Sequence, residues 1–331
     1  MIKAHDVSSI VVRAPNWVGD VVLTLPALRD VRRAFPASRL VVLARPWVAG
    51  LYAAVPEIDG VVESHGTLAD AAAVRGRYDV GLLLPNSFAS AFTLWRAGIP
   101  ERWGYATDAR GVLLTRSSRV SASLGGRSQV YYYRAMLEGL GLAVSGPPDA
   151  SLACPEAWAE RGRALLGSPG PWIGINPGAA YGTAKRWPPE RFAAAAALVA
   201  RRSGAQVAIV GSAAERPLAE AIAAQLGGAA RVLCGETTLA DLVGVLRELR
   251  LLLTNDSGPM HLAAALGTPL VAVFGSTDWT ETAPFSERAR IVREQTECAP
   301  CRLRECPIDH RCMARVAVDR VAATALELLA A

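Results

Sequence analysis

The chain has 331 residues, of which 51% are hydrophobic and 20% charged, and its formal net charge is +5. This length exceeds the ~250 to 300 residues at which a single core usually stops growing, so we expect two domains. No stretch approaches the ~20 consecutive apolar residues that span a bilayer, and the start has an early acid without a long apolar region, which predicts a cytoplasmic protein. The arginines are scattered among acids, which argues against a nucleic-acid partner and is compatible with an anionic substrate or a membrane surface.

The first half alternates short apolar strands with stretches of helical periodicity. We expect strands at 11–12, 40–43, 61–62 and 80–84, and helices at 25–34 and 68–74. Because parallel strands need crossover helices, this alternation predicts a parallel sheet covered on both faces.

The pattern restarts after a Pro-rich passage at 146–158, which we interpret as a linker. Strands are expected at 172–175, 206–210, 232–233, 251–254 and 270–274, and helices at 189–202, 217–226, 239–248 and 259–266. The prediction is an α/β protein with two domains, 1–160 and 161–331, each built on a parallel sheet. Ligands of such sheets bind at the carboxyl ends of the strands, so a shared site is expected in a cleft between the domains.

The stretch NWVGDVVLTLPAL places Asp20 between the first predicted strand and a helix that should start near it. A carboxylate at this junction either caps the helix or acts in catalysis, and the residues alone leave both open. The stretch lacks G-x-G-x-x-G spacing, which disfavours a dinucleotide-binding dehydrogenase.

The stretch INPGAAYGTAKRWPPERF carries Lys185 on a glycine-containing loop that precedes a helix. A flexible ammonium on such a loop suits a phosphate, although a loop lysine is often only a solvated surface charge. Lys3 is the only other lysine in the chain.

The stretch LLLTNDSGPMHLAAALGTP is a buried strand that enters a turn and then a helix opened by Pro259. The turn would direct the N–H groups of Ser257 and Gly258 towards one point, with the helix dipole behind them, which favours an anion-binding site. The alternative is a simple capped turn in which Asp256 or Ser257 is the cap. His261 faces either the ligand or the core.

Four cysteines, Cys298, Cys301, Cys306 and Cys312, lie in the stretch CAPCRLRECPIDHRC with C-x2-C-x4-C-x5-C spacing. Four thiolates so close can hold zinc or an iron-sulfur cluster, but the spacing fits neither common pattern. Reduced structural thiols and disulfides are the alternatives. The isolated Cys154 and Cys234 are expected to be small buried residues.

Taken together, the stretches APNWVGDVVLTLPAL, NPGAAYGTAKRWP and TNDSGPMHLAAALGTPLVAVFGST resemble the bacterial lipopolysaccharide heptosyltransferases of glycosyltransferase family 9. The similarity extends through nearly the whole chain. The K-R-W-P and N-D-S-G-x-M-H segments are specific to the family, and the N-W-V-G-D and G-A-x-x-G-x-A-K-R-W forms favour its type II branch over type I.

The resemblance implies the GT-B architecture of two Rossmann-like domains, an N-terminal one that binds the acceptor and a C-terminal one that binds ADP-L-glycero-D-manno-heptose. Transfer would invert the anomeric configuration without a required metal. By this resemblance Asp20 is the base that deprotonates the acceptor hydroxyl, and Lys185 stabilises the leaving diphosphate. Glu215 would hold the ribose hydroxyls and Thr237 would lie beside the adenine. The remaining substrate-binding residues would be Asn16, Asp256, Ser257, Gly258 and His261.

The implied acceptor is a Kdo2-lipid A-type glycolipid, which carries phosphates and carboxylates. Arg96 and Arg102 are candidate contacts for it, with simple surface charges as the alternative. We expect peripheral association with the inner face of the cytoplasmic membrane. Type I, type III or protein heptosyltransferases with the same donor stay open, as does a non-catalytic nucleotide-sugar-binding protein that would not need Asp20.

Overall fold

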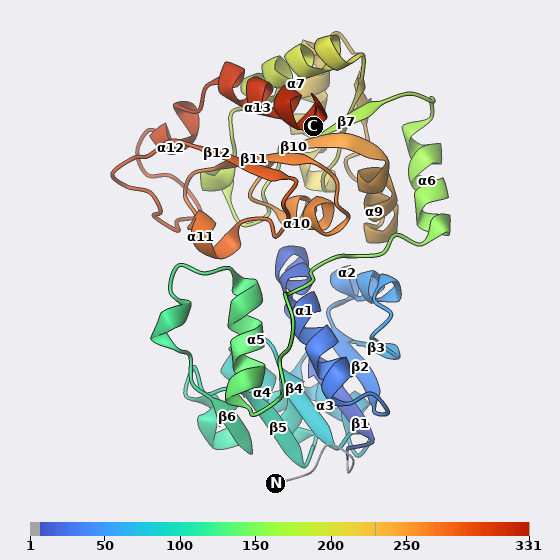
Figure 1. Cartoon of the computed structure of the whole chain (residues 1–331), viewed down its shortest axis with the longest axis vertical. Coiled ribbons are helices and arrows are strands. Elements are labelled where there is room, and N and C mark those ends of the chain that lie inside the picture. Colours follow the sequence, from blue (N-terminus) through green and yellow to red (C-terminus); the bar gives the residue numbers. More distant parts are fainter. Residues whose placement is uncertain (1–6, 229, 331) are drawn as a thin grey trace. The chain divides into compact units, whose positions relative to one another are not determined.

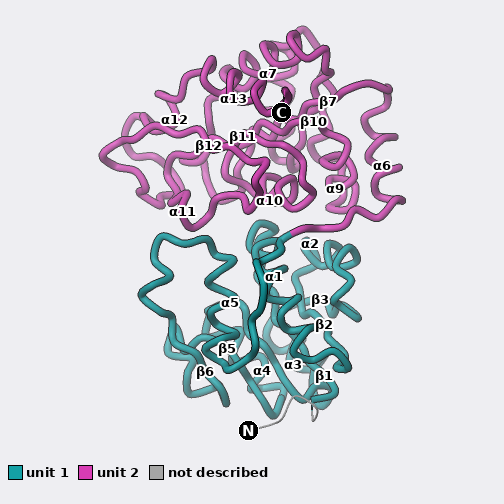
Figure 2. The backbone as a smooth tube through the Cα atoms, in the orientation of Figure 1, with its two compact units in different colours: residues 1–150 teal, residues 151–331 magenta. Residues whose placement is uncertain are grey.

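The computed structural model describes residues 7–228 and 230–330, and the chain divides into two compact units between Ala150 and Ser151 (Figures 1 and 2). Each unit contains a six-stranded sheet whose paired strands are all parallel. The predicted α/β class with two parallel sheets is therefore confirmed. No helix within these described residues is long and apolar enough to cross a bilayer.

In the first unit the strand order is β3-β2-β1-β4-β5-β6. The strands are β1 (Ser9–Arg13), β2 (Arg39–Ala44), β3 (Gly60–Glu63), β4 (Val80–Leu83), β5 (Glu101–Tyr105) and β6 (Arg116–Ser118). The helices are α1 (Val18–Ala34), α2 (Pro46–Ala49), α3 (Thr67–Val74), α4 (Phe88–Arg96) and α5 (Gln129–Gly139). The order reverses between β1 and β4, and in doubly wound sheets the ligand lies outside the carboxyl ends of the strands at that point.

The second unit repeats this arrangement, with the order β12-β11-β10-β7-β8-β9 and the reversal between β7 and β10. Its strands are β7 (Trp172–Asn176), β8 (Gln206–Ile209), β9 (Arg231–Val232), β10 (Leu249–Asn255), β11 (Leu270–Phe274) and β12 (Ala289–Arg293). Its helices are α6 (Glu156–Leu166), α7 (Pro189–Ser203), α8 (Arg216–Gln225), α9 (Leu239–Glu248), α10 (Gly258–Ala265), α11 (Trp279–Thr282), α12 (Arg311–Ala314) and α13 (Val318–Ala330).

Helix α6 lies in part of the chain that we interpreted as a linker, so that interpretation is wrong from residue 156 onward. The helix packs against α9 through two glycines, Gly162 and Gly244. A Cβ atom on Gly162 would lie 2.2 Å from the backbone carbon of Gly244, so only glycine permits this backbone contact. The contact fixes α6 to the second unit.

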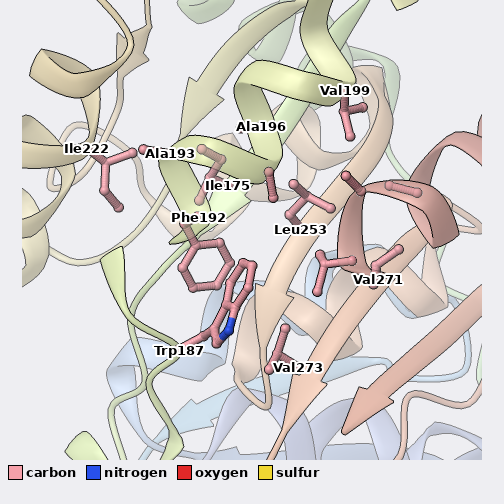
Figure 3. Packing of buried hydrophobic residues seen from close by; sticks show 14 of the residues in the cluster. Ile175, Trp187, Phe192, Ala193, Ala196, Val199, Ile222, Leu253, Val271 and Val273 are labelled. Carbon is pink, nitrogen blue, oxygen red and sulfur yellow. The ribbon is translucent and has the colours of Figure 1, made fainter. Parts of the chain in front are cut away.

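The core of the second unit forms where α7 packs on the sheet (Figure 3). Alanines on α7 let the helix approach the strands closely. The rings of Trp187 and Phe192 meet edge-on with centroids 5.0 Å apart, a favourable aromatic geometry. Trp187 is only 1% exposed, and its Nε1 donates to the Val316 carbonyl at 3.2 Å. This residue therefore anchors the end of the loop that carries Lys185.

Candidate active site

Asp20 lies at the carboxyl edge of the first sheet, where the chain passes from β1 to α1. The N-cap of α1 is Trp17, whose side chain makes no capping hydrogen bond. Asp20 is the third residue of the helix and is half-buried, so the interpretation of Asp20 as the N-cap is wrong. Burial, and after it the charge of Asp20, raise the pKa of the Tyr133 phenol on α5 well above its usual value. Asp20 and Tyr133 therefore lie near each other.

Asn16 fixes the loop before Asp20. Its Oδ1 accepts from Arg13 Nη2 at 3.1 Å, and its carbonyl accepts from Trp47 Nε1 at 2.8 Å. Arg13 also donates to the carbonyls of Ala14 and Leu43, both at 3.0 Å, and burial lowers its pKa. We did not identify Arg13 from the sequence, because an arginine at the end of a strand has no local pattern that indicates a hydrogen bond to the following loop.

Arg96 and Arg102 lie at the opposite edge of the same sheet. Arg96 ends α4, which runs back from the carboxyl end of β4, and Arg102 is the second residue of β5. The Arg102 guanidinium donates to the carbonyls of Leu113 at 2.7 Å and Ile99 at 2.5 Å, and burial lowers its pKa. The structure does not bring either arginine together with Asp20.

Other polar groups, which we did not predict, lie at the carboxyl edge of β4 and β5. Asn86 follows β4, and its Nδ2 donates to Tyr132 Oη at 2.7 Å. Arg110 follows β5, is 0% exposed, and donates through Nε to the Tyr105 carbonyl at 2.8 Å. Among the described residues, Asn86 Oδ1 and Arg110 Nη2 are buried without a hydrogen-bond partner. Both residues therefore connect the loops at this edge to neighbouring parts of the first unit.

In the second unit, Lys185 lies on the loop that follows β7. Its Nζ is 2.7 Å from Asp256 Oδ2, and the two side chains are only 13% and 5% exposed. The alternative of a solvated surface lysine is therefore wrong. An ammonium has three N–H donors, so others remain for a ligand while the ion pair fixes its position.

Three loops converge on Asp256, which directly follows β10. Its Oδ2 also accepts from Thr277 Oγ1, on the loop after β11, at 2.6 Å. The contact with Lys185 joins residues 71 positions apart in the chain. Asp256 therefore organises the donor-side loops, and its carboxylate does not cap the following helix.

Ser257 is the N-cap residue of α10, but its side chain makes no capping hydrogen bond. Its hydroxyl instead donates to Asn176 Oδ1 at 2.7 Å, at the end of β7. The alternative of a turn capped by a Ser257 or Asp256 side chain is therefore wrong. The first turn of α10 keeps backbone N–H groups for an anion, at the point where the strand order reverses.

Two buried asparagines, missed in the sequence, hold this edge together. Asn176 Nδ2 donates to the Val210 carbonyl at 3.0 Å. Asn255 Oδ1 accepts from the Trp187 backbone N–H at 2.9 Å, and its Nδ2 donates to the Pro177 carbonyl at 2.7 Å. Asn255 thus ties both ends of the lysine loop to β10. Position at a strand end was the only available signal.

His261 lies in α10, 4% exposed, close to the Lys185–Asp256 pair. Burial lowers its pKa to about 4. The negative charge of Asp256 acts in the opposite direction, and the positive charge of Lys185 lowers the pKa further. The ring is therefore neutral near neutral pH. Its Nδ1 is buried without a hydrogen-bond partner among the described residues.

This pKa predicts a pH dependence of stability. Between about pH 6.5 and pH 4, His261 binds a proton in the unfolded chain but not in the folded protein. The neutral buried ring therefore contributes its full share of the free energy of unfolding above this window, and that share is lost as the pH falls through it. We expect a loss approaching about 3 kcal/mol. We therefore expect the free energy of unfolding, measured with urea at several pH values in this window, to fall less steeply with decreasing pH in His261→Gln than in the wild type. Exposed His65 supplies the control, His65→Gln, and equal slopes in all three proteins would contradict the expectation.

Glu215 and Thr237 follow β8 and β9 at the same edge of the second sheet. Glu215 Oε2 accepts from the Ser212 backbone N–H at 2.7 Å and from the Ser212 hydroxyl at 2.9 Å. Its other carboxylate oxygen lies over Gly178, where a Cβ atom would come within 1.7 Å of it. Thr237 is half-buried and precedes Thr238, the N-cap of α9. Glu215 thus borders the loop that carries Lys185.

The six cysteines are all free, so the disulfide alternative is wrong. Cys298 is exposed, Cys301 and Cys306 are half-buried, and Cys312 is buried. Among the residues described, no three His, Cys, Asp or Glu side chains form a group that could hold a metal ion. Of the isolated pair, Cys234 is buried as expected, whereas Cys154 is half-buried.

The family model for glycosyltransferase family 9 (heptosyltransferase) matches residues 70–311. With its two parallel six-stranded sheets, the chain has the GT-B fold of a glycosyltransferase, as expected from the sequence. The chain belongs to glycosyltransferase family 9, the heptosyltransferases.

Named relatives and a solved structure agree with this assignment. Lipopolysaccharide heptosyltransferase 2 of Salmonella typhimurium is 33% identical over 307 residues, which cover 86% of this chain and 87% of that protein. The enzyme of the same name from Escherichia coli is 32% identical over 306 residues, with 86% and 87% covered. The structure of E. coli ADP-heptose LPS heptosyltransferase II matches with a TM-score of 0.85 and 29% identity, over 97% of this chain and 98% of that one.

Proposed function

We propose that this enzyme transfers L-glycero-D-manno-heptose from ADP-heptose to the first heptose of heptosyl-Kdo2-lipid A. The observation that carries the donor half is the Lys185–Asp256 pair beside the uncapped start of α10, at the reversal point of the second sheet. The remaining N–H donors of the Lys185 ammonium and the free backbone N–H groups at such a point suit a nucleotide diphosphate. The similarity to named type II enzymes supports the acceptor half.

In the proposed mechanism Asp20 removes the proton from the acceptor hydroxyl as its oxygen attacks the anomeric carbon. The bond from that carbon to the ADP oxygen breaks, and negative charge develops on the diphosphate. Lys185 and the N–H groups at the start of α10, from Gly258 onward, stabilise this charge, so no metal is required.

The other proposed contacts distribute over the same edge of the second sheet. Glu215 holds the ribose hydroxyls through the oxygen that faces Gly178, and Thr237 lies beside the adenine. His261, neutral and buried, contacts the phosphates only as an uncharged group. Asn16 positions the acceptor loop beside Asp20.

An acceptor panel tests this function. With ADP-heptose as the donor, we expect heptose to be added to heptosyl-Kdo2-lipid A and not to Kdo2-lipid A without heptose, as judged by the mass of the product. Transfer to the unsubstituted acceptor would assign type I, and transfer only to a further-extended core or to a protein would assign another acceptor class. Binding of ADP-heptose without transfer to any acceptor would indicate a nucleotide-sugar-binding protein.

We also propose that the protein acts in the cytoplasm and binds peripherally to the inner face of the cytoplasmic membrane. Three aromatic rings on α4 stack in sequence, Phe88 on Phe92 at 6.4 Å and Phe92 on Trp95 at 5.5 Å. Phe88 is 46% exposed and Trp95 47% exposed, and Arg96 follows directly at the end of the helix. Aromatic rings beside a basic residue suit the lipid headgroup region.

For this surface we expect Trp95→Ser to reduce binding to vesicles that contain anionic lipid by about fivefold, because an interfacial aromatic contributes roughly 1 kcal/mol. Co-sedimentation with the vesicles measures the change. Ile308→Ser, which alters an exposed apolar side chain of the second unit, is the control and should bind like the wild type. Equal binding of both variants would exclude α4 as the membrane-facing surface.

A further inference from the structure

The cysteine-rich segment, residues 298–312, packs directly against the loop that carries Lys185. Tyr181 Oη donates to the Arg302 carbonyl at 3.1 Å, and the Ala184 backbone N–H donates to the Arg304 carbonyl at 2.9 Å. Between them, Gly182 lies so close that a Cβ atom there would be 2.2 Å from the Arg304 carbonyl oxygen. The cysteine-rich segment and the lysine loop are therefore packed tightly against each other, although neither belongs to a strand.

His310 supplies a further contact in the opposite direction. Its Nε2 lies 2.9 Å from the Ala184 carbonyl oxygen, and because a carbonyl only accepts, Nε2 must carry the proton. Ala184 is thus held through both its N–H and its carbonyl, one residue before Lys185. The Tyr181 ring adds a shared contact, with Lys185 Nζ 5.0 Å and Arg304 Cζ 5.1 Å from its centroid.

The thiols contribute to the position of His310. Its backbone N–H donates to Cys306 Sγ at 3.3 Å, and its φ of 56° places it in the left-handed region as the N-cap of α12. Cys312, in the same short helix, packs against Gly275, where a Cβ atom would lie 2.9 Å from its sulfur. A continuous path therefore runs from Cys306 through His310 and Ala184 to Lys185.

We propose that the cysteine-rich segment positions the donor site, with His310 as a positioning residue that holds the lysine loop and Cys306 as the group that holds His310. This inference rests on the proposed function for its link to the donor, whereas the contact between segment and loop does not. The loop has little structure of its own, a single turn at Thr183–Lys185, so its conformation depends on these bonds. Loss of one of them should mobilise Lys185 and weaken binding of the diphosphate.

The first test compares His310→Ala with His310→Gln. Both replacements experience the same left-handed backbone strain, but only glutamine keeps an N–H donor near the Nε2 position. In the unliganded protein we expect faster hydrogen exchange of the Ala184 amide in His310→Ala, and largely restored protection in His310→Gln. Arg311→Ala is the matched control, since the ion pairs of Arg311 are with Asp309 and Glu297, neither of which belongs to the lysine loop.

The same variants should separate donor affinity from turnover. We expect His310→Ala to raise the Kd for ADP and the KM for ADP-heptose by about fivefold to tenfold, the loss of roughly one hydrogen bond, with a smaller effect on kcat. Unchanged exchange and unchanged Kd for ADP in His310→Ala would overturn the proposal. If exchange changes while no heptose transfer is found even in the wild type, the positioning role stands and the proposed function fails.

A second comparison tests the thiol. Cys306→Ala removes the acceptor of the His310 backbone N–H, whereas Cys306→Ser retains one. We expect faster hydrogen exchange of the Ala184 amide in the alanine variant than in the serine variant. In Cys154→Ala, which alters a free cysteine outside the segment, exchange of this amide should equal that of the wild type. Exchange in Cys306→Ala equal to that of the wild type would exclude Cys306 from the path.

Discussion

Asp20→Asn is expected to reduce kcat for heptose transfer by about 10²- to 10⁴-fold, the usual contribution of a positioned general base. Asparagine preserves the shape of the side chain but cannot accept the proton of the acceptor hydroxyl. The Kd for ADP-heptose, measured by calorimetry, should stay within about twofold of the wild-type value, because the residues assigned to the donor belong to the second unit. Loss of rate without loss of donor binding is the signature of the proposed base.

The control for this variant addresses the position of Asp20 in the first turn of a helix. Any acid there interacts with the helix dipole, so a fall in rate could come from a perturbed helix. Glu156→Gln removes an exposed acid from the first turn of α6 and should leave kcat unchanged. Equal thermal unfolding of Asp20→Asn and the wild type would show that α1 is intact. Turnover at the wild-type rate in Asp20→Asn would remove the base from the mechanism.

Lys185→Met is expected to impair both stability and donor binding. It leaves the Asp256 carboxylate, 5% exposed, without its cationic partner, and a broken buried ion pair costs about 3 kcal/mol of unfolding free energy. It also removes a charge-assisted contact to the diphosphate, which should raise the Kd for ADP-heptose by about 10- to 100-fold. Denaturant unfolding and calorimetry measure the two effects separately.

The double variant Lys185→Met/Asp256→Asn distinguishes these effects. Without a lone buried charge, we expect most of the stability to return, while donor binding and turnover stay weak. Arg163→Met, which breaks the exposed ion pairs with Glu156 and Glu248, should change neither property appreciably. Recovery of activity together with stability in the double variant would show that Lys185 has only a structural role.

Local signals in the sequence predicted the elements around the donor site. The apolar run before Asn255, the small residues at Ser257 and Gly258 and the proline at 259 together indicate a strand, a turn and a helix start. The structure places α10 at Gly258–Ala265, within one residue of the prediction. The ion pair between Lys185 and Asp256 could not be predicted, because the two residues lie 71 positions apart in the chain and only the strand order brings them together.

Two strands of the first sheet were not predicted, because neither is a run of apolar residues. Strands β5 and β6 have the sequences ERWGY and RSS, and β6 lies at the edge of the first sheet, where polar residues are tolerated. Helix α6 follows a proline and buries only Ala159, Gly162 and Leu166. Its apolar face is therefore small, and the prolines before it led us to interpret the start of the helix as part of a linker.

Charge alone was a poor guide to the acceptor side. Arg96 and Arg102 are basic residues of the expected unit, but whether an arginine lies at the amino or the carboxyl edge of a sheet depends on strand direction. Arg110 and Asn86, which lie at the carboxyl edge, carry no distinctive local pattern. Their buried and unpartnered atoms are visible only in the folded structure.

The anomeric configuration of the transferred heptose is the most direct test of Asp20 as a base. A carboxylate that deprotonates the acceptor gives a single displacement, whereas a carboxylate that attacks the sugar gives a covalent intermediate and a second displacement. NMR of the product formed from ADP-heptose and heptosyl-Kdo2-lipid A distinguishes the two outcomes. The proposed mechanism predicts that the configuration is inverted relative to the donor. A product with the configuration of the donor would contradict it.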